Sequence, residues 1–275
     1  MSAARPLTAA ACVAQLPKFR VGVTDWNLRS EANPASFALA KRLGFDGVQV
    51  SLASGRGAGR APITDDLVKQ YVAQSREHAL PITSTCLNIL HTNYLKSDAL
   101  GPKRVAEGIA LTKAIGVEVM LLPFFGDGAL KTPDEMDRVG DILRELAPDA
   151  QKAGVILGLE DTISARDNVR IMDRAKSPAV LTYYDVGNST VNGHTVIEEL
   201  RWLGRDRICE VHLKDNPHFM GEGTIDFPGV IDALADIGFA RWAVLETSSP
   251  TKMLEDDMRR NLAFTRGLVT ARAKA

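Results

Sequence analysis

The stretch AGVILGLED, from Ala153 to Asp161, contains the pattern that decides the fold. A glycine follows a long amphipathic segment, a short run of Val, Ile and Leu follows the glycine, and two acidic residues end the run. A glycine at a helix end adopts the left-handed conformation at little cost. A short apolar run bounded by polar residues is typical of a strand that is covered on both faces. We therefore expect a helix to end at Gly154 and a buried strand to follow it.

The same alternation extends along the chain in both directions. Eight short apolar runs read as strands: Val21 to Thr24, Gly47 to Leu52, Pro81 to Leu87, Val117 to Leu122, Val155 to Leu159, Leu181 to Asp185, Ile208 to Leu213 and Trp242 to Leu245. Amphipathic segments lie between them, among them Pro34 to Leu43, Leu67 to His78, Ala106 to Ile115, Pro133 to Ala153 and Val230 to Ile237. Strand–helix alternation repeated eight times predicts an α/β fold, a (β/α)₈ TIM barrel. A doubly wound sheet is the alternative, but no GxGxxG follows the first strand.

Local signals support this assignment. Glycines stand where helices should stop, at Gly44, Gly116 and Gly238. Thr132 and Asp226 precede early prolines and read as helix N-caps. No linker rich in Pro, Gly and Ser divides the chain, so we expect a single barrel domain over residues 21–275.

Composition excludes several classes of protein. Of the 275 residues, 45% are hydrophobic and 24% are charged, with a formal net charge of −1, which argues against a disordered chain. No basic excess exists to neutralise phosphates, so we expect no nucleic-acid partner. No apolar run approaches the roughly 20 residues that cross a bilayer, so we expect no membrane partner.

The N-terminal segment, residues 1–20, is rich in alanine and contains Pro6. It is not an intact signal peptide, which leaves a disordered lead-in or the remnant of a trimmed export signal. Three widely spaced cysteines, Cys12, Cys86 and Cys209, form no disulfide framework and read as small buried hydrophobes. A reducing, cytoplasmic location fits them best, with export as the alternative.

Four consecutive predicted strands end in side chains that can bind a metal. These are Glu160, Asp185, His212 and Glu246. In such barrels the strand ends and the loops after them form the active site, so the four side chains should converge. Three converging carboxylates repel one another unless a cation lies among them. The oxygen-rich set favours Mn²⁺, with Mg²⁺, Zn²⁺ or Co²⁺ as alternatives.

The strings GLEDT, YYDVGNS, HLKD, GEGTIDF and VLET, which carry these four residues and their surroundings, resemble the xylose-isomerase-like TIM-barrel family of sugar and sugar-phosphate isomerases and epimerases. The resemblance extends from about Val21 onward. In the ketose 3-epimerase branch the matching positions bind one divalent ion, commonly manganese. The resemblance also implies that Glu160 and Glu246 form the acid–base pair. That branch has a substrate-binding histidine where this chain has Asn188, which leaves the substrate open.

Five further residues are candidates for substrate binding. Lys214 should point into the barrel mouth by strand periodicity, or form a structural ion pair with a neighbouring carboxylate. Trp26 follows the first strand and could wall the pocket, while Gln49, in the second strand, could bind substrate. His91 and His218 lie in the loops after the third and seventh strands.

A glycine-rich stretch with two arginines, Gly55 to Arg60, follows the second strand. It could hold a phosphate or carboxylate, or form a flexible lid. Because no helix-start lysine motif accompanies it, we expect no requirement for a phosphorylated substrate.

The leading functional hypothesis is a metal-dependent isomerase or epimerase that moves a proton next to the carbonyl of a sugar or polyol derivative. A lyase or dehydratase of a keto-sugar or keto-cyclitol would use the same first step. An endonuclease-IV-like phosphodiesterase needs a histidine-rich zinc cluster and a basic DNA-binding face, and it is disfavoured by the five histidines and the net charge of −1. A non-catalytic carbohydrate-binding barrel is disfavoured by the complete ligand set. The sequence leaves open whether the chain forms a homo-oligomer.

Overall fold

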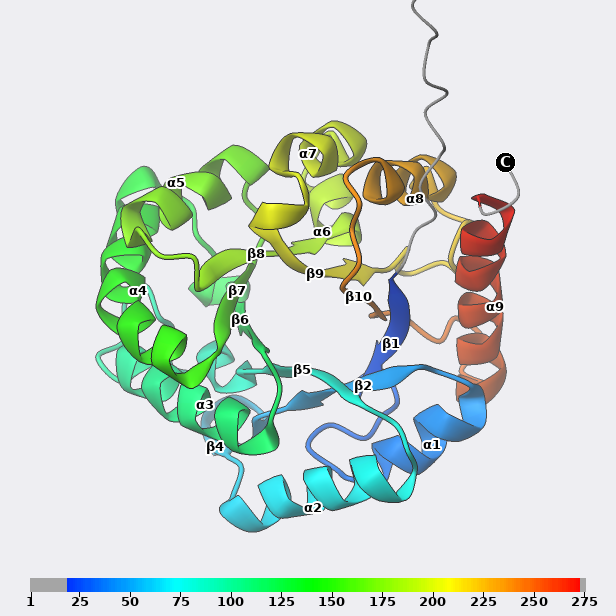
Figure 1. Cartoon of the computed structure of the whole chain (residues 1–275), viewed down its shortest axis with the longest axis horizontal. Coiled ribbons are helices and arrows are strands. Elements are labelled where there is room, and N and C mark those ends of the chain that lie inside the picture. The colour runs from blue at the N-terminus through cyan, green and yellow to red at the C-terminus, as the bar shows by residue number, and fades with distance from the viewer. Residues whose placement is uncertain (1–18, 273–275) are drawn as a thin grey trace, which may run out of the picture.

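Eight parallel strands close into a barrel in the computed structural model of the chain, which describes residues 19–272 (Figure 1). Around the barrel the strands follow the order β1-β10-β9-β8-β7-β6-β5-β2. Their bounds are β1 Arg20–Thr24, β2 Gly47–Ser51, β5 Ile82–Cys86, β6 Val119–Pro123, β7 Ile156–Glu160, β8 Val180–Asp185, β9 Ile208–Leu213 and β10 Trp242–Leu245. The eight expected strands and the predicted TIM barrel are confirmed.

Helices form a ring outside the barrel (Figure 1). They are α1 Ser36–Leu43, α2 Asp65–Glu77, α3 Gly101–Ile115, α4 Pro133–Ala153, α5 Ala165–Ala175, α6 Val186–Val191, α7 Val196–Leu203, α8 Phe227–Asp236 and α9 Leu254–Arg272. Short 3₁₀ turns occupy Gly57–Gly59, Asn88–His91, Gly126–Gly128 and Arg205–Arg207. No helix in residues 19–272 is long and apolar enough to cross a membrane.

The expected helix ends are present. Gly44, Gly116 and Gly154 have φ values of 92°, 86° and 72° and close α1, α3 and α4. Thr132 begins α4 with a capping box, since its side chain accepts from Glu135 N–H and the Glu135 carboxylate accepts from Thr132 N–H. Helix α3 starts at Gly101, earlier than the apolar pattern from Ala106 indicated, because its first turn contains Pro102 and charged residues.

A small antiparallel hairpin interrupts the alternation after β2. Strand β3 (Ala53–Ser54) pairs with β4 (Ala61–Pro62), and the Gly57–Gly59 turn joins them. The sequence pattern predicts a lid or an anion-binding loop here and does not indicate the hairpin.

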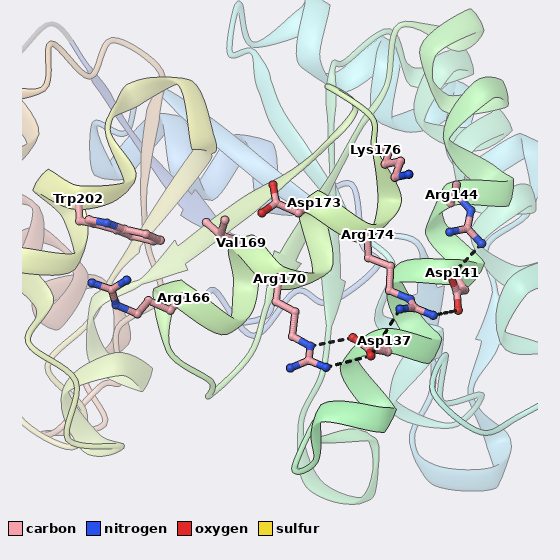
Figure 2. A pocket seen from close by; sticks show the side chains of 10 residues that line it. All are labelled: Asp137, Asp141, Arg144, Arg166, Val169, Arg170, Asp173, Arg174, Lys176 and Trp202. Atoms are coloured by element: carbon pink, nitrogen blue, oxygen red, sulfur yellow. Dashed lines mark hydrogen bonds and ion pairs between the residues drawn. The ribbon is translucent and has the colours of Figure 1, made fainter.

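Outside the barrel, α4 and α5 are joined by exposed ion pairs (Figure 2). Arg170 Nε lies 2.7 Å from Asp137 Oδ1, and Arg174 Nη2 lies 2.6 Å from Asp141 Oδ2. Water and salt screen ion pairs at such an exposed surface, so these pairs contribute little to the stability of the fold.

The N-terminal segment predicted to be a lead-in or signal remnant lies outside the described residues, apart from Phe19 and Arg20. Cys12 also lies outside them. Cys86 and Cys209 are buried free thiols, as expected for small hydrophobes.

Gly47 provides a test of the barrel packing. A Cβ atom at this position would lie 2.9 Å from the carbonyl oxygen of Pro81, 2.9 Å from the Trp242 ring and 2.8 Å from the Thr83 methyl group. We predict that Gly47→Ala lowers the free energy of unfolding in urea by about 1–3 kcal/mol, because backbone and ring must shift.

Gly267 is the matched control for this substitution, because it lies in α9 with open space around the added Cβ. Gly267→Ala should be neutral or stabilise by up to about 1 kcal/mol through helix propensity. Equal effects of the two substitutions would contradict the packing argument.

Candidate metal centre and active site

Four neighbouring strands bring four ligand-type side chains to one end of the barrel. Glu160 ends β7, Asp185 ends β8, His212 lies near the end of β9, and Glu246 follows β10. Asp185 is the register partner of His212, and His212 is the partner of Val244, so these strand ends are level. Closure of the sheet therefore places the four side chains side by side.

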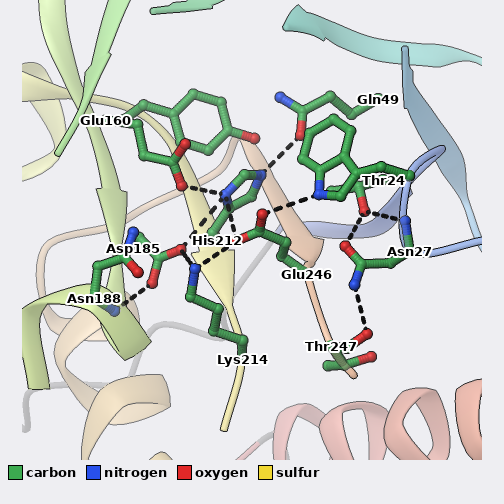
Figure 3. Close-up of polar contacts among 12 residues, drawn as sticks. Thr24, Asn27, Gln49, Glu160, Asp185, Asn188, His212, Lys214, Glu246 and Thr247 are labelled. Carbon is green, nitrogen blue, oxygen red and sulfur yellow. Dashed lines mark hydrogen bonds and ion pairs between the residues drawn. The ribbon is translucent and has the colours of Figure 1, made fainter. Parts of the chain in front are cut away.

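The four side chains meet around the Nδ1 atom of His212 (Figure 3). This atom lies 2.8 Å from Glu160 Oε1, 3.6 Å from Asp185 Oδ2 and 3.5 Å from Glu246 Oε2. Glu160, Asp185 and His212 are buried, and Glu246 is partly exposed. We call these four residues the ligand cluster.

Burial and mutual repulsion perturb the charges of the cluster. Burial raises the pKa of Glu160 to about 7, with the neighbouring Glu246 and Asp185 adding to the rise and His212 opposing it. Burial works against the charged form of His212, but Glu160 and Glu246 outweigh it and raise the pKa of His212 to about 10. The cluster therefore needs positive charge, and a protonated His212 supplies part of it.

Lys214 supplies a second positive charge. Its Nζ lies 2.8 Å from Asp185 Oδ2 and 2.6 Å from Glu246 Oε2. Burial again opposes ionisation, but Asp185 and Glu246 prevail and raise the pKa of Lys214. The pKa of Asp185 is held below its usual range, because Lys214 and His212 outweigh the effect of its burial.

Gln49 forms a hydrogen bond with the imidazole of His212 and fixes its orientation. Gln49 Oε1 lies 2.8 Å from His212 Nε2, and both side chains are fully buried. An amide oxygen only accepts, so Nε2 carries the proton and the Nδ1 lone pair is directed at the carboxylates when the ring is neutral. The structure therefore places Gln49 against His212, and Gln49 does not line either of the two cavities at this end of the barrel.

Trp26 lies in the loop after β1, and its side chain reaches the cluster. Its Nε1–H donates to Glu246 Oε1 over 2.9 Å. The loop is held by buried Asp25, whose carboxylate accepts from Ser51 Oγ at 2.7 Å, from Ser51 N–H at 2.9 Å and from Ala32 N–H at 3.1 Å. Asp25 therefore fixes the position of Trp26 relative to β2.

Glu160 and Glu246 of the cluster line one cavity of about 500 Å³, and Lys214, which contacts the cluster, lines a second cavity of about the same volume. The first, the β2-side cavity, is lined by Trp26, Glu31, Ser51, Arg56, Arg60, Cys86, Asn88, His91, Pro123, Phe125, Glu160 and Glu246. The second, the β9-side cavity, includes Lys214, Asn188 and His218 in its lining. Both volumes lie within the range of about 300–1,000 Å³ that holds small ligands. All the predicted substrate-binding residues except Gln49 thus line one cavity or the other.

The residues of the cluster fit a single divalent cation. Their ligand atoms all lie within 4.8 Å of one another, which matches two ligands on opposite sides of one ion at about 2.0–2.6 Å each. A divalent ion together with Lys214 would neutralise three carboxylates while His212 is neutral. The donor set therefore suits a metal ion, and the identity of the ion is open.

Comparison with known proteins supports this interpretation of the fold. Residues 37–268 match the family model described as "Xylose isomerase-like TIM barrel". A curated relative, the 2-epi-5-epi-valiolone 7-phosphate 2-epimerase of Actinoplanes sp. (strain ATCC 31044 / CBS 674.73 / SE50/110), is 27% identical over 204 residues, which are 72% of this chain and 73% of the relative.

Two solved structures share the fold. An L-ribulose 3-epimerase structure aligns with a TM-score of 0.75 at 16% identity, covering 93% of this chain and 96% of the other. The 3-keto-D-glucoside 4-epimerase of E. coli aligns with a TM-score of 0.74 at 20% identity, covering 91% of this chain and all of the other.

Three further residues that line the β2-side cavity are not among those predicted from the sequence: Asn88, Phe125 and Glu31. Asn88 and Phe125 follow β5 and β6, so the strand-end rule that found the ligand cluster would have found them too. Glu31 lies well beyond the end of β1, and nothing in its local sequence indicates that it reaches the cavity.

We predict that the protein binds one divalent ion per chain and that Asp185→Ala weakens Mn²⁺ binding by more than about 100-fold, because it removes a charged ligand. Elemental analysis and calorimetry measure the two quantities. Asp173→Ala, at an exposed position on α5, is the control and should bind as the wild type does. Folded wild-type protein that takes up no Mn²⁺ would contradict the metal site.

We further predict that Gln49→Met weakens Mn²⁺ binding by about 10- to 100-fold, since it removes the acceptor that orients His212. Gln70→Met, on the exposed face of α2, should leave the affinity unchanged. An unchanged affinity in folded Gln49→Met protein would show that the orientation of His212 does not depend on this contact.

Proposed function

The chain belongs to the xylose isomerase-like TIM-barrel family, and from this membership we propose that it is a metal-dependent epimerase or isomerase of a sugar or related polyol derivative. The observation that carries the proposal is the ligand cluster, because it combines a candidate cation site with two glutamates that face an open cavity. The three similar proteins are named as a 2-epimerase, a 3-epimerase and a 4-epimerase. They therefore support the reaction class and leave the substrate and the reacting carbon open.

We propose Mn²⁺ as the resident ion, held by Glu160, Asp185, His212 and Glu246. Three carboxylates and one imidazole favour a hard or borderline divalent ion over a thiophilic one, with Mg²⁺, Zn²⁺ and Co²⁺ as alternatives. When bound, such an ion stabilises negative charge that develops on neighbouring substrate oxygens.

Glu160 and Glu246 are proposed as the proton-transfer pair. Both line the β2-side cavity, and they come from strands on opposite sides of β8 and β9, so they can address two faces of one carbon. One carboxylate removes the proton next to the carbonyl, and the other returns a proton to the opposite face, which inverts the centre. Return of the proton to the adjacent carbon gives isomerisation instead.

The surrounding side chains hold and orient the substrate. Lys214, which forms ion pairs with Asp185 and Glu246, can also donate to a substrate oxygen. Asn188 and His218 line the β9-side cavity, where hydroxyl groups would meet amide and imidazole donors. Trp26 and His91 form part of the opposite wall, and the indole N–H of Trp26 fixes one oxygen of Glu246.

Two alternatives remain distinguishable by experiment. A keto-sugar lyase or dehydratase would use the same proton removal and then expel a β-substituent, which produces an enone absorbance. A phosphodiesterase of the endonuclease IV type is disfavoured, because the cluster contains a single histidine.

The buried thiols Cys86 and Cys209 favour a reducing, cytoplasmic location.

We predict that Glu160→Gln and Glu246→Gln each lower turnover by at least about 100-fold, because the amide keeps the size and removes the base. The assay is exchange of the substrate α-proton with solvent deuterium, followed by NMR over a library of ketoses and keto-sugars. Metal occupancy is measured for each variant, because both glutamates are also proposed ligands.

Glu198→Gln, on the exposed face of α7, is the control and should exchange as the wild type does. A Glu160 or Glu246 variant that retains its metal and exchanges the proton at the wild-type rate would remove that glutamate as the base. Lys214 would then be the next candidate.

A further inference from the structure

The β3–β4 hairpin is a fixed part of the β2-side cavity. Thr92 Oγ1 donates to the Gly57 carbonyl over 3.1 Å, which ties the hairpin turn to the loop after β5. Gly55 has a φ of 82°, and a Cβ atom there would lie 2.6 Å from the Gly59 carbonyl oxygen. The hairpin can therefore close only with glycine at this position, and it presents Arg56 and Arg60 to the cavity.

Arg60 is set into the cavity wall by a shared carboxylate. Its Nη1 lies 2.9 Å from Glu31 Oε1, and its side chain is 11% exposed. Asn88 Nδ2 donates to the same Glu31 oxygen over 2.7 Å and to the Ala53 carbonyl over 2.9 Å. Glu31 therefore holds the hairpin arginine and the loop after β5 together.

This wall retains polar atoms without partners. Within residues 19–272, the buried Arg60 Nε–H has no acceptor, and the buried Asn88 Oδ1 has no donor. Unpaired buried polar atoms are costly unless a ligand or water satisfies them. A ligand carrying both acceptor oxygens and hydroxyl groups would match this pair.

Arg56 adds an uncompensated charge. Its side chain is exposed, and its guanidinium has no ion-pair or hydrogen-bond partner in the part of the chain that the structure describes. Glu31 balances only one of the two arginines, so the hairpin side of the cavity carries one unbalanced positive charge, while Glu160 and Glu246 line the cavity at the ligand cluster. A planar guanidinium suits phosphate or carboxylate oxygens, which it can bind in a bidentate manner.

We propose that Arg56 and Arg60 form a subsite for an anionic substituent, a phosphate or a carboxylate, on the substrate. This inference rests on the proposed function only in taking the rest of the substrate as a sugar or polyol. The hairpin follows β2, which lies three strands from β7 around the barrel, so the anion is held away from the carbon that Glu160 addresses. The expectation of no phosphate requirement rested on the absence of a helix-start lysine motif beside Gly55 to Arg60, and recognition by guanidinium groups needs no such motif.

The test uses unreactive ligands, so that binding is separated from proton transfer. Calorimetry compares D-arabinitol, D-arabinitol 5-phosphate and D-arabinonate on the metal-loaded protein. We expect at least one of the two anions to bind about 10-fold or more tightly than the neutral polyol. A gain by the phosphate alone identifies a phosphate substituent, and a gain by the aldonate alone identifies a carboxylate.

Arg56→Gln should reduce the anion preference to within about threefold, and Arg60→Lys, which keeps the charge facing Glu31 but loses the planar fork, should reduce it in part. Arg76→Gln, on the exposed surface of α2, is the control and should keep the full preference. Equal binding of the three ligands by the wild type overturns the subsite, and so does a preference that survives in the Arg56→Gln/Arg60→Lys double variant. Because the ligands contain no ketone or aldehyde, failure of the proposed proton transfer would not alter this measurement.

Discussion

Three carboxylates that converge on one buried imidazole are the constraint on which the rest of the site depends. In a buried site that excludes water, such a group of negative charges is stable only when cations lie beside it. Lys214 and a protonated His212 provide them in the bare chain, and a divalent ion would take the place of the histidine proton. The same electrostatic demand therefore explains both the position of Lys214 and the suitability of the site for a metal.

Asp185 and His212 of the ligand cluster are also held by contacts outside the cluster. Asp185 is also the N-cap of α6, because its Oδ1 accepts from Asn188 N–H over 2.7 Å. His212 rests edge-on against the Tyr183 ring, with ring centroids 4.6 Å apart, and bonds to Gln49. A ligand set fixed in this way needs little reorganisation when charge develops on a substrate, which is the condition for electrostatic stabilisation of a transition state.

The sequence predicted those features that depend on local pattern and strand position. The eight strands, the glycine helix ends and the Thr132 cap follow from neighbouring residues, and the ligand cluster follows from strand ends being level in a closed barrel. Gln49 as the partner of His212 could not be foreseen, because β2 and β9 are far apart in sequence and their contact depends on the barrel interior. The Glu31–Arg60–Asn88 group joins three separate loops, and only their packing brings it together.

The residues proposed for the reaction and the residues proposed for substrate recognition lie on different parts of the fold. The ligand cluster lies on strand ends, where a shift of any one residue would misalign the others, so its geometry is tied to the barrel register. Arg56 and Arg60 lie instead on a hairpin inserted after β2, Asn188 lies in the short helix α6 after β8, and His218 lies in the loop after β9. Loops of this kind can change length and charge without moving the strands that hold the cluster. In the proposed function, the barrel therefore constrains the reaction class, whereas the hairpin after β2 and the segments after β8 and β9 constrain the identity of the substrate.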